Sequence, residues 1–171
     1  AGECGPQDYS YPYGPDRSRF QEKKSVQPKK DIGKHVLLYS DRCIRCTRCI
    51  RFSDEISGTS ELGYFNRGVH NEIDIFPGER MDNRLSGNTV DICPVGALLD
   101  REFLFKQRVW FLEEANSICP GCSAGCNIRV DFRNERIYRL KPRENPDVND
   151  YWMCDDGRHG WGYVHSDDRL L

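Results

Sequence analysis

Apolar residues occur along this chain in short stretches separated by polar, turn-rich segments. Residues 127–132 and 136–140 alternate apolar with polar side chains around Arg133–Glu135, which predicts a β-hairpin. The apolar segment His35–Tyr39 fits either a short strand or a helical turn, because periodicity does not separate the two at this length. The pattern therefore predicts small elements joined by many turns.

Three further segments carry weaker patterns. Residues 58–87 are rich in glycine, asparagine and turn residues, and strand faces there are expected from Ile73, Ile75 and Met81. Asp100 is placed to N-cap a short helix that continues through Phe105. Residues 108–112 have the aromatic and branched composition of a strand.

The N-terminal part shows no helical or alternating period. Residues 5–34 carry several prolines, namely Pro6, Pro12, Pro15 and Pro28. We therefore expect an extended connector that lies on a surface. Its basic run, residues 22–30, is expected to be a solvated face rather than a nucleic-acid contact.

Together these patterns predict an α+β fold of small, irregular, loop-rich modules. We expect an N-terminal segment and connector at 1–34, a first module at 35–115, and a second, mainly antiparallel β module at 116–171. The chain starts at Ala1 without a methionine and stops at Leu171 after a charged run, which suggests a piece of a longer polypeptide.

Composition narrows the function classes. The 171 residues carry a net charge of -2, so there is no overall basic field of the kind that gathers nucleic acid. No apolar run approaches the length of a membrane span, and no secretory signal is present. A reducing bacterial or organellar interior is therefore expected. Only 37% of residues are apolar, so something besides hydrophobic burial is expected to stabilise the fold.

Nine cysteines, an odd number, cannot all pair in disulfides within the chain. One set joins three closely spaced thiols to a later Cys-Pro pair and consists of Cys43, Cys46, Cys49 and Cys93. Such spacing is typical of a loop around a 4Fe-4S cubane, since each thiolate reaches a different iron. A mononuclear zinc site usually takes two separated pairs, so zinc and disulfides are the less favoured alternatives.

The second set consists of Cys119, Cys122, Cys126 and Cys154. Pro120, Gly121 and Gly125 let the backbone turn tightly around a bulky ligand. A 4Fe-4S cluster is again favoured, although a tetrahedral zinc site is a stronger alternative here than in the first set. Cys4 is left over, and a single cysteine is by itself most often an incidental thiol.

Other polar residues give weaker indications. Arginine recurs every three residues through the first set, at Arg42, Arg45, Arg48 and Arg51. These side chains either stabilise the reduced form of an anionic cluster or face solvent or a partner. The histidines lie outside any metal-ligand spacing and are expected to have surface or packing roles: His35, His70, His159 and His165. No phosphate loop, zinc-protease motif or nucleophile elbow occurs, so no substrate-converting site is expected.

The chain resembles the large iron-sulfur subunit of respiratory complex I, the NADH:quinone oxidoreductase. The matching stretches extend along nearly the whole chain: Gly2–Cys4, Gln7–Asp8, Asp41–Phe52, Asn66–Gly68, Val90–Leu98, Trp110, the second cysteine set, and Asn127–Val130. Pro6 stands where that family usually has an apolar residue other than proline.

The resemblance implies two 4Fe-4S clusters and part of a third. Cys43, Cys46, Cys49 and Cys93 would hold an on-path centre, in a chain of clusters between the NADH/FMN site and quinone. The second cysteine set matches an off-path centre of some bacterial members, in a module similar to the iron-sulfur domain of molybdopterin oxidoreductases. Cys4 resembles the last ligand of a His/Cys3-ligated centre whose other ligands are absent from this chain.

The resemblance also implies a subunit of a quinone-reducing translocase. Its partners would be the flavin-bearing and iron-sulfur subunits of the peripheral arm, on the cytoplasmic side of the bacterial inner membrane. Relatives with a pterin usually carry lysine where Asp156 stands, so no pterin is expected. The alternatives are the cluster-bearing segment of an NAD-linked formate dehydrogenase or hydrogenase, and a zinc-stabilised interaction module without redox activity.

Overall fold

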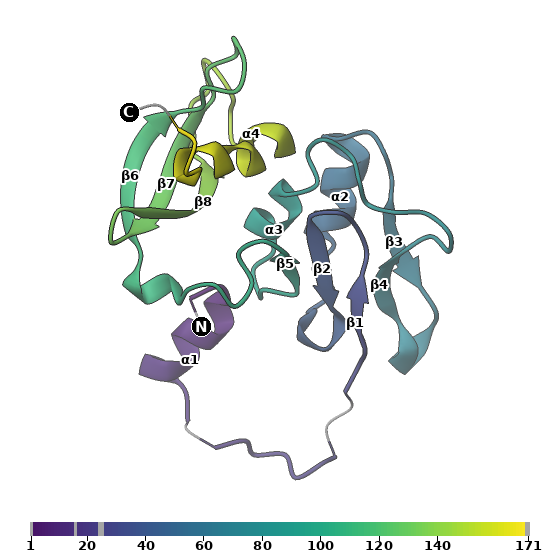
Figure 1. Cartoon of the computed structure of the whole chain (residues 1–171). Helices are drawn as coiled ribbons and strands as arrows, with labels where there is room; N and C mark the ends of the chain where they lie inside the picture. The colour runs from purple at the N-terminus through teal and green to yellow at the C-terminus, as the bar shows by residue number, and fades with distance from the viewer. Residues whose placement is uncertain (1, 16, 24–25, 170–171) are drawn as a thin grey trace.

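The computed structural model describes residues 2–15, 17–23 and 26–169 (Figure 1). Lys24 and Ser25 of the basic run lie outside the described residues. The described residues form three small antiparallel sheets. The first contains β1 (Lys29–Asp31), β2 (Val36–Tyr39) and β5 (Leu98–Asp100), and the second contains β3 (Leu62–Phe65) and β4 (Glu72–Ile75). The third contains β6 (Glu113–Ile118), β7 (Asn127–Arg133) and β8 (Arg136–Pro142). The predicted α+β, loop-rich class is confirmed.

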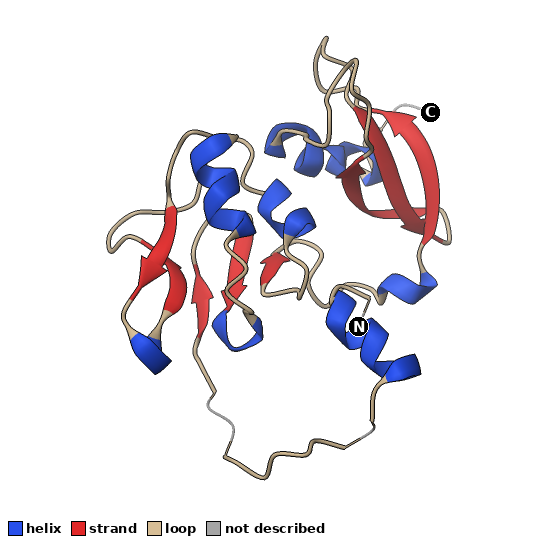
Figure 2. Ribbon diagram, turned by 180° about the vertical axis from the view of Figure 1, so that it is seen from behind, coloured by secondary structure: helices blue, strands red, loops and turns tan. Residues whose placement is uncertain are grey.

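Short helices connect and cover these sheets (Figure 2). The α-helices are α1 (Gly5–Tyr13), α2 (Arg48–Glu55), α3 (Asn88–Ile92) and α4 (Asp155–His159). Three single 3₁₀ turns are η1 (Ser40–Arg42), η2 (Gly68–His70) and η3 (Val109–Phe111), and a longer 3₁₀ segment is η4 (Gly160–His165). Within the described part of the chain, none of the helices has the length and apolar character that crossing a bilayer requires.

The first module contains the sheets β1-β2-β5 and β3-β4 with α2 and α3. Its apolar segment Val36–Tyr39 is a strand because it pairs on both sides, with Lys30 opposite Leu38 and Asp100 opposite Val36. The core beneath it combines side chains from both sheets with one cysteine: Ile32, Val36, Leu38, Cys49, Leu62, Ile73, Met81 and Leu98. One of the candidate ligand thiols is thus part of the hydrophobic core.

The second module contains the sheet β6-β7-β8 with α4. The predicted hairpin is confirmed as β7 and β8, and its turn residues Asn134 and Glu135 have φ of 49° and 62°. Two successive left-handed residues are the geometry of a type I′ turn, whose twist matches that of the strands. β6 adds a third strand, in register from Glu113 opposite Phe132 to Ile118 opposite Asn127.

The predicted strand at 108–112 is wrong. Val109–Phe111 forms the 3₁₀ turn η3, and pairing starts only at Glu113. The reason is a tertiary contact, since Gly2 lies so close that a Cβ on it would be 3.0 Å from the Cβ of Val109. The aromatic segment therefore packs beside the N-terminus, where Figure 1 also places it.

The expectation of an extended connector over residues 5–34 is wrong at its start. Gly5–Tyr13 is helical, with a proline at the first turn, where its missing N–H costs no hydrogen bond. None of the residues of α1 is buried, so no apolar face marked this helix in the sequence.

The predicted helix from Asp100 to Phe105 is also wrong. The Asp100 carboxylate accepts hydrogen bonds from the backbone N–H groups of Glu102 and Phe103 at 2.8 and 3.3 Å, as a helix N-cap does. The chain nevertheless forms only turns, and Phe105 has a φ of 65°, which ends any helix. Ile73 and Ile75 lie in β4 as expected, whereas Met81 is buried but belongs to a loop.

The two modules meet through buried polar groups of α3 and α4, which lie side by side (Figures 1 and 2). The Asp155 carboxylate accepts from the Ser86 hydroxyl at 2.6 Å and from the Gly87 N–H at 2.9 Å. Arg158 donates to Asp91 at 2.6 Å and is 4% exposed. Because buried charges are costly unless paired, these contacts fix one orientation of the modules.

Asn88 is the centre of this interface. Its amide donates to the Met153 carbonyl at 2.8 Å, and its carbonyl accepts from the Met153 N–H at 3.1 Å and from Arg158 at 3.2 Å. The residue is fully buried. Asn88 therefore satisfies both backbone groups of a residue in the other module.

We predict that Asn88→Ala lowers the free energy of unfolding by about 2–4 kcal/mol, because it leaves several buried polar groups without partners. Urea denaturation of the metal-loaded chain, followed by circular dichroism, measures this change. The exposed Gln21→Ala is the control and should shift stability by less than about 0.5 kcal/mol. Identical midpoints for Asn88→Ala and the unchanged chain would contradict the proposed role of this interface.

Candidate metal centres

The first set of cysteines converges although its members come from four separate places. Cys43 follows η1, Cys46 lies in the next loop, Cys49 is in the first turn of α2, and Cys93 follows α3. All four line one small, largely apolar pocket, together with Leu38, Ile44, Arg48, Ile73, Val95, Ala97 and Leu98. The fold thus brings together the four thiols that the sequence spacing selected.

The loop between Cys43 and Cys49 is strained in a way that suits an anionic ligand. Arg45 and Thr47 have φ of 58° and 62°, a left-handed conformation that costs about 1–2 kcal/mol for each such residue. This bending lets the Arg45 N–H donate to Cys43 Sγ at 3.3 Å. The Tyr64 hydroxyl donates to the Arg45 carbonyl at 2.6 Å and so fixes the turn. Successive backbone N–H groups in such turns form concavities that bind anions.

Two thiols of the first set, Cys43 and Cys49, have a raised pKa. Burial, and then the nearby Cys43 and Cys93, raise the pKa of the Cys49 thiol to about 12. Burial also raises the pKa of Cys43, against the opposing effect of the Arg45 N–H. Cys49 is therefore a neutral thiol near pH 7 unless a cation displaces its proton. The convergence of four cysteines on one largely apolar pocket fits a metal-thiolate cluster.

The cysteines of the second set lie in the loop between β6 and β7 and at the start of α4. Cys119 follows β6, Cys122 and Cys126 lie in the loop before β7, and Cys154 is the N-cap of α4. The Cys119 N–H donates to the Cys126 carbonyl at 2.8 Å, and the Gly157 N–H donates to Cys154 Sγ at 3.4 Å. Burial, followed by the proximity of the other three thiols, raises the pKa of Cys126. The four sulfurs therefore share one neighbourhood.

Glycines keep the space beside these sulfurs open. A Cβ on Gly157 would lie 2.9 Å from Cys119 Sγ and 3.6 Å from Cys154 Sγ, and one on Gly121 would lie 3.5 Å from Cys119 Sγ. A contact below 3 Å is closer than a carbon and a sulfur tolerate. The backbone of α4 thus approaches two of the thiols directly, which fits a bulky shared ligand.

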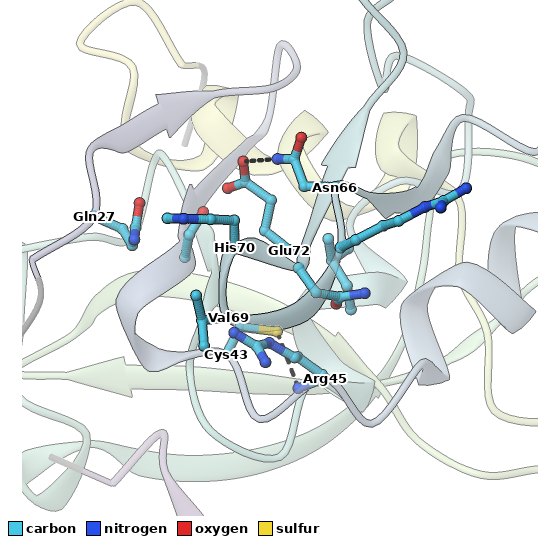
Figure 3. A pocket seen from close by; sticks show the side chains of 11 residues that line it. Gln27, Cys43, Arg45, Asn66, Val69, His70 and Glu72 are labelled. Atoms are coloured by element: carbon cyan, nitrogen blue, oxygen red, sulfur yellow. Dashed lines mark hydrogen bonds between the residues drawn. The ribbon is translucent and has the colours of Figure 1, made fainter.

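Two of the arginines that recur through the first cysteine set make their contacts with residues other than the cysteines. Arg42 stacks over the ring of Tyr39 at 4.7 Å, and Arg51 donates to Glu55 at 3.1 Å on the surface of α2. Arg45 instead lines a polar pocket of about 440 Å³ that opens beside Cys43 (Figure 3). The remaining walls of this pocket come mainly from residues 66–73. Solvent or a partner can therefore approach the first set from this side.

Cys4 lies outside both sets and is the half-buried N-cap of α1. The Gly5 N–H donates to the Pro94 carbonyl at 3.0 Å, so the segment runs beside the Cys93 loop. Arg139 of β8 donates to the carboxylate of Glu3 at 2.6 Å. Both modules thus hold the residues that flank Cys4.

Two segments of this chain match known domain families. Residues 33–99 match the model for the ferredoxin-like domain of NADH-quinone oxidoreductase subunit 3, and residues 112–166 match the molybdopterin oxidoreductase Fe4S4 domain. The chain is 44% identical over 157 residues to the mitochondrial NADH dehydrogenase (ubiquinone) iron-sulfur protein 1 of Solanum tuberosum, covering 92% of this chain and 21% of that protein. It is 40% identical over 160 residues to an NADH-quinone oxidoreductase subunit of Rickettsia felis, covering 94% and 24%.

Over 92–94% of its length, this chain is similar to the large iron-sulfur subunit of NADH-quinone oxidoreductase. It spans about a quarter of the length of the relatives it matches. Each matched domain contains one complete cysteine set, and both domain types indicate bound 4Fe-4S clusters.

A solved structure shares part of this arrangement. The crystal structure of an NAD⁺-reducing NiFe-hydrogenase in its H₂-reduced state matches with a TM-score of 0.53 and 26% identity. The match covers 64% of this chain and 48% of the hydrogenase chain.

The structure also assembles a group that sequence reasoning missed. His35, Glu102 and His159 come within 4.8 Å of one another through their potential ligand atoms. No motif could have indicated this group, because the three residues are far apart in the sequence and only the packing of the two modules joins them.

We predict that Gly157→Ala selectively weakens the second centre, because its Cβ would lie 2.9 Å from Cys119 Sγ and displace that sulfur. About half of the bound iron should be lost while the first set retains its share. Gly160→Ala is the matched control, since a Cβ at Gly160 meets no heavy atom within 4 Å. Iron analysis of the two purified variants measures the difference, and equal iron contents would contradict this account of the site.

Proposed function

We propose that this chain carries electrons through two 4Fe-4S clusters in the peripheral arm of an NADH:quinone oxidoreductase, between the NADH/FMN site and quinone. The observation that carries the proposal is the convergence of two complete four-thiol sets, one within each matched iron-sulfur domain. A bound 4Fe-4S cluster supplies reversible one-electron chemistry.

In this proposal Cys43, Cys46, Cys49 and Cys93 ligate the on-path cluster. The residues around these cysteines influence how easily the cluster is reduced, through a hydrogen bond to sulfur and through burial. The Arg45 N–H donates to a ligand sulfur, and the buried Val95 and Ala97 limit access of water. Donors to sulfur favour the more negative reduced state, whereas a low-dielectric surrounding opposes it.

The second set, Cys119, Cys122, Cys126 and Cys154, ligates an off-path cluster in the proposal. Asp155 and Arg158 follow Cys154 directly in α4 and form the buried contacts with the first module. The cluster that orders the start of α4 therefore also orders the interface between the modules. Asp156, at the position where a pterin relay would need lysine, forms an exposed ion pair with Arg84 at 2.8 Å.

In this proposal Cys4 supplies one ligand of a third centre, whose other ligands are absent from these 171 residues. Glu3 and Gly5 hold it against both modules, as the contacts with Arg139 and Pro94 suggest. The domain division is proposed as 1–34 for the Cys4 segment and connector, 35–115 for the on-path module and 116–171 for the off-path module.

The proposed partners are the flavin-bearing and iron-sulfur subunits of the arm, on the cytoplasmic face of the bacterial inner membrane. Several aromatic side chains of the N-terminal segment are largely exposed: Tyr9, Tyr11, Tyr13 and Phe20. Exposed aromatic groups in such numbers are more typical of a contact surface than of a free one.

A segment of an NAD-linked hydrogenase is the second candidate function. The likeness to the NiFe-hydrogenase structure supports it, at lower identity and coverage than the NADH-quinone oxidoreductase relatives. Quinone-reductase activity of the purified complex, with no hydrogen uptake, distinguishes the first function from the second.

We predict that Cys46→Ala abolishes electron flow from NADH to quinone in the assembled complex, because one iron of the on-path cluster loses its thiolate. The electron paramagnetic resonance signal of that cluster should disappear while the second cluster keeps its own. Thr59→Ala, on an exposed loop of the same module, is the control. Unchanged quinone reduction in an assembled Cys46→Ala complex would refute the on-path assignment.

For Cys122→Ala we predict a different loss. The variant should lower the yield of assembled complex several-fold, while each assembled complex keeps most of its turnover, because the second cluster acts through α4 and the module interface. Native gels scored for assembly, together with turnover per assembled complex, separate the two effects. A fully assembled but inactive Cys122→Ala complex would place this cluster on the electron path.

A further inference from the structure

The interface between the modules contains a cluster of side chains outside both thiol sets. The rings of His35 and His159 stack with centroids 4.0 Å apart and planes 6° apart. The Glu102 carboxylate reaches both rings, with one oxygen 3.8 Å from His35 Nδ1 and the other 3.3 Å from His159 Nδ1. Two imidazoles and one carboxylate thus meet at a single point.

Rigid backbone holds all three residues. His35 immediately precedes β2 and Glu102 follows β5, and these strands pair with Val36 opposite Asp100. The Arg101 N–H also donates to the His35 carbonyl at 2.9 Å. His159 ends α4, which the buried contacts of Asp155 and Arg158 attach to the first module. The cluster is therefore placed by both modules.

The imidazole of His35 is available as a neutral ligand. Burial, and then the neighbouring His159, lower the pKa of His35, so its ring carries a free lone pair near pH 7. The side chains of His35 and His159 are only 14% and 10% exposed. Nε2 of His159 is buried and has no hydrogen-bond partner among the described residues. A buried polar atom without a partner is costly, and a ligand that reorients the ring would relieve this cost.

We propose that His35, His159 and Glu102 bind one Zn²⁺ ion, which fastens the second module to the first. Two imidazoles and a carboxylate are a ligand set that zinc accepts, whereas calcium and magnesium require mainly oxygen ligands. Because Glu102 is half exposed, a water molecule completes a tetrahedral site from the solvent side. The site lacks thiolates, which distinguishes it from both cysteine sets.

The spacing of the ligands suits this ion. Bonds of about 2.0–2.1 Å to nitrogen and oxygen place tetrahedral ligands roughly 3.3–3.4 Å apart. The nitrogen-oxygen separations of 3.3 and 3.8 Å are already near this value. Stacked rings direct their lone pairs in parallel, so binding requires each ring to turn about its Cβ–Cγ bond. This torsion is broad in histidine, so the turn carries little torsional cost.

Zinc titration of the anaerobically purified, iron-sulfur-loaded chain tests the proposal. After equilibrium dialysis we expect one zinc per chain with no loss of iron. Zinc K-edge absorption spectroscopy should show only nitrogen and oxygen ligands at about 2.0–2.1 Å. Sulfur neighbours at about 2.3 Å would place the metal on the cysteine sets instead and overturn the proposal.

Three variants make the test specific. H159F keeps a planar ring in the stack but removes its lone pairs, and Glu102→Gln removes the charge of a half-exposed side chain. Each should weaken zinc binding by more than about 100-fold, since even changes to second-shell groups cost about 10–100-fold. His70→Gln, at an exposed histidine, is the matched control and should bind zinc as the unchanged chain does.

A second readout concerns stability. Saturating zinc should raise the thermal unfolding midpoint of the chain by about 5–10 °C, and H159F, which retains the packing, should lose this shift. Zinc binding that survives in both H159F and Glu102→Gln, or a chain that binds no zinc, would show that the histidine stack is a packing contact only.

Discussion

The structure depends on a buried thiol of the first cysteine set that stays uncharged near neutral pH unless a metal displaces its proton. Cys49 is part of the core of the first module, and its thiol has a pKa raised to about 12 by burial and by neighbouring cysteines. The remaining core is small for a chain in which 37% of residues are apolar. Metal-thiolate bonds would therefore replace part of the hydrophobic burial that larger domains use, and cluster binding would be coupled to folding.

The same coupling extends from the second cysteine set to the rest of the molecule. Cys154 caps α4, and the following residues Asp155 and Arg158 make the buried contacts that orient the modules. β8 reaches the N-terminal segment through Arg139 and Glu3, beside Cys4. In the proposed function, an off-path cluster at this set would therefore still affect the geometry of the centres that carry electrons.

The sequence predicted best the features that local chemistry determines. The hairpin β7-β8 follows from alternation around Asn134–Glu135, and the two cysteine sets follow from thiol spacing. Features set by tertiary contact were not predictable. β6 has no buried residue, and its pairing with β7 replaces any pattern of its own. α1 has no buried residue, and the segment after Arg108 turns because it packs against Gly2. His35 and His159 have no shared motif, and only the module interface joins them.

The most direct test of this account is low-temperature electron paramagnetic resonance of the dithionite-reduced chain, combined with analysis of iron and acid-labile sulfide. The account predicts about eight irons and eight sulfides per chain, with signals from two distinct 4Fe-4S centres. A preparation that folds with zinc in the cysteine sets and contains no sulfide would contradict it.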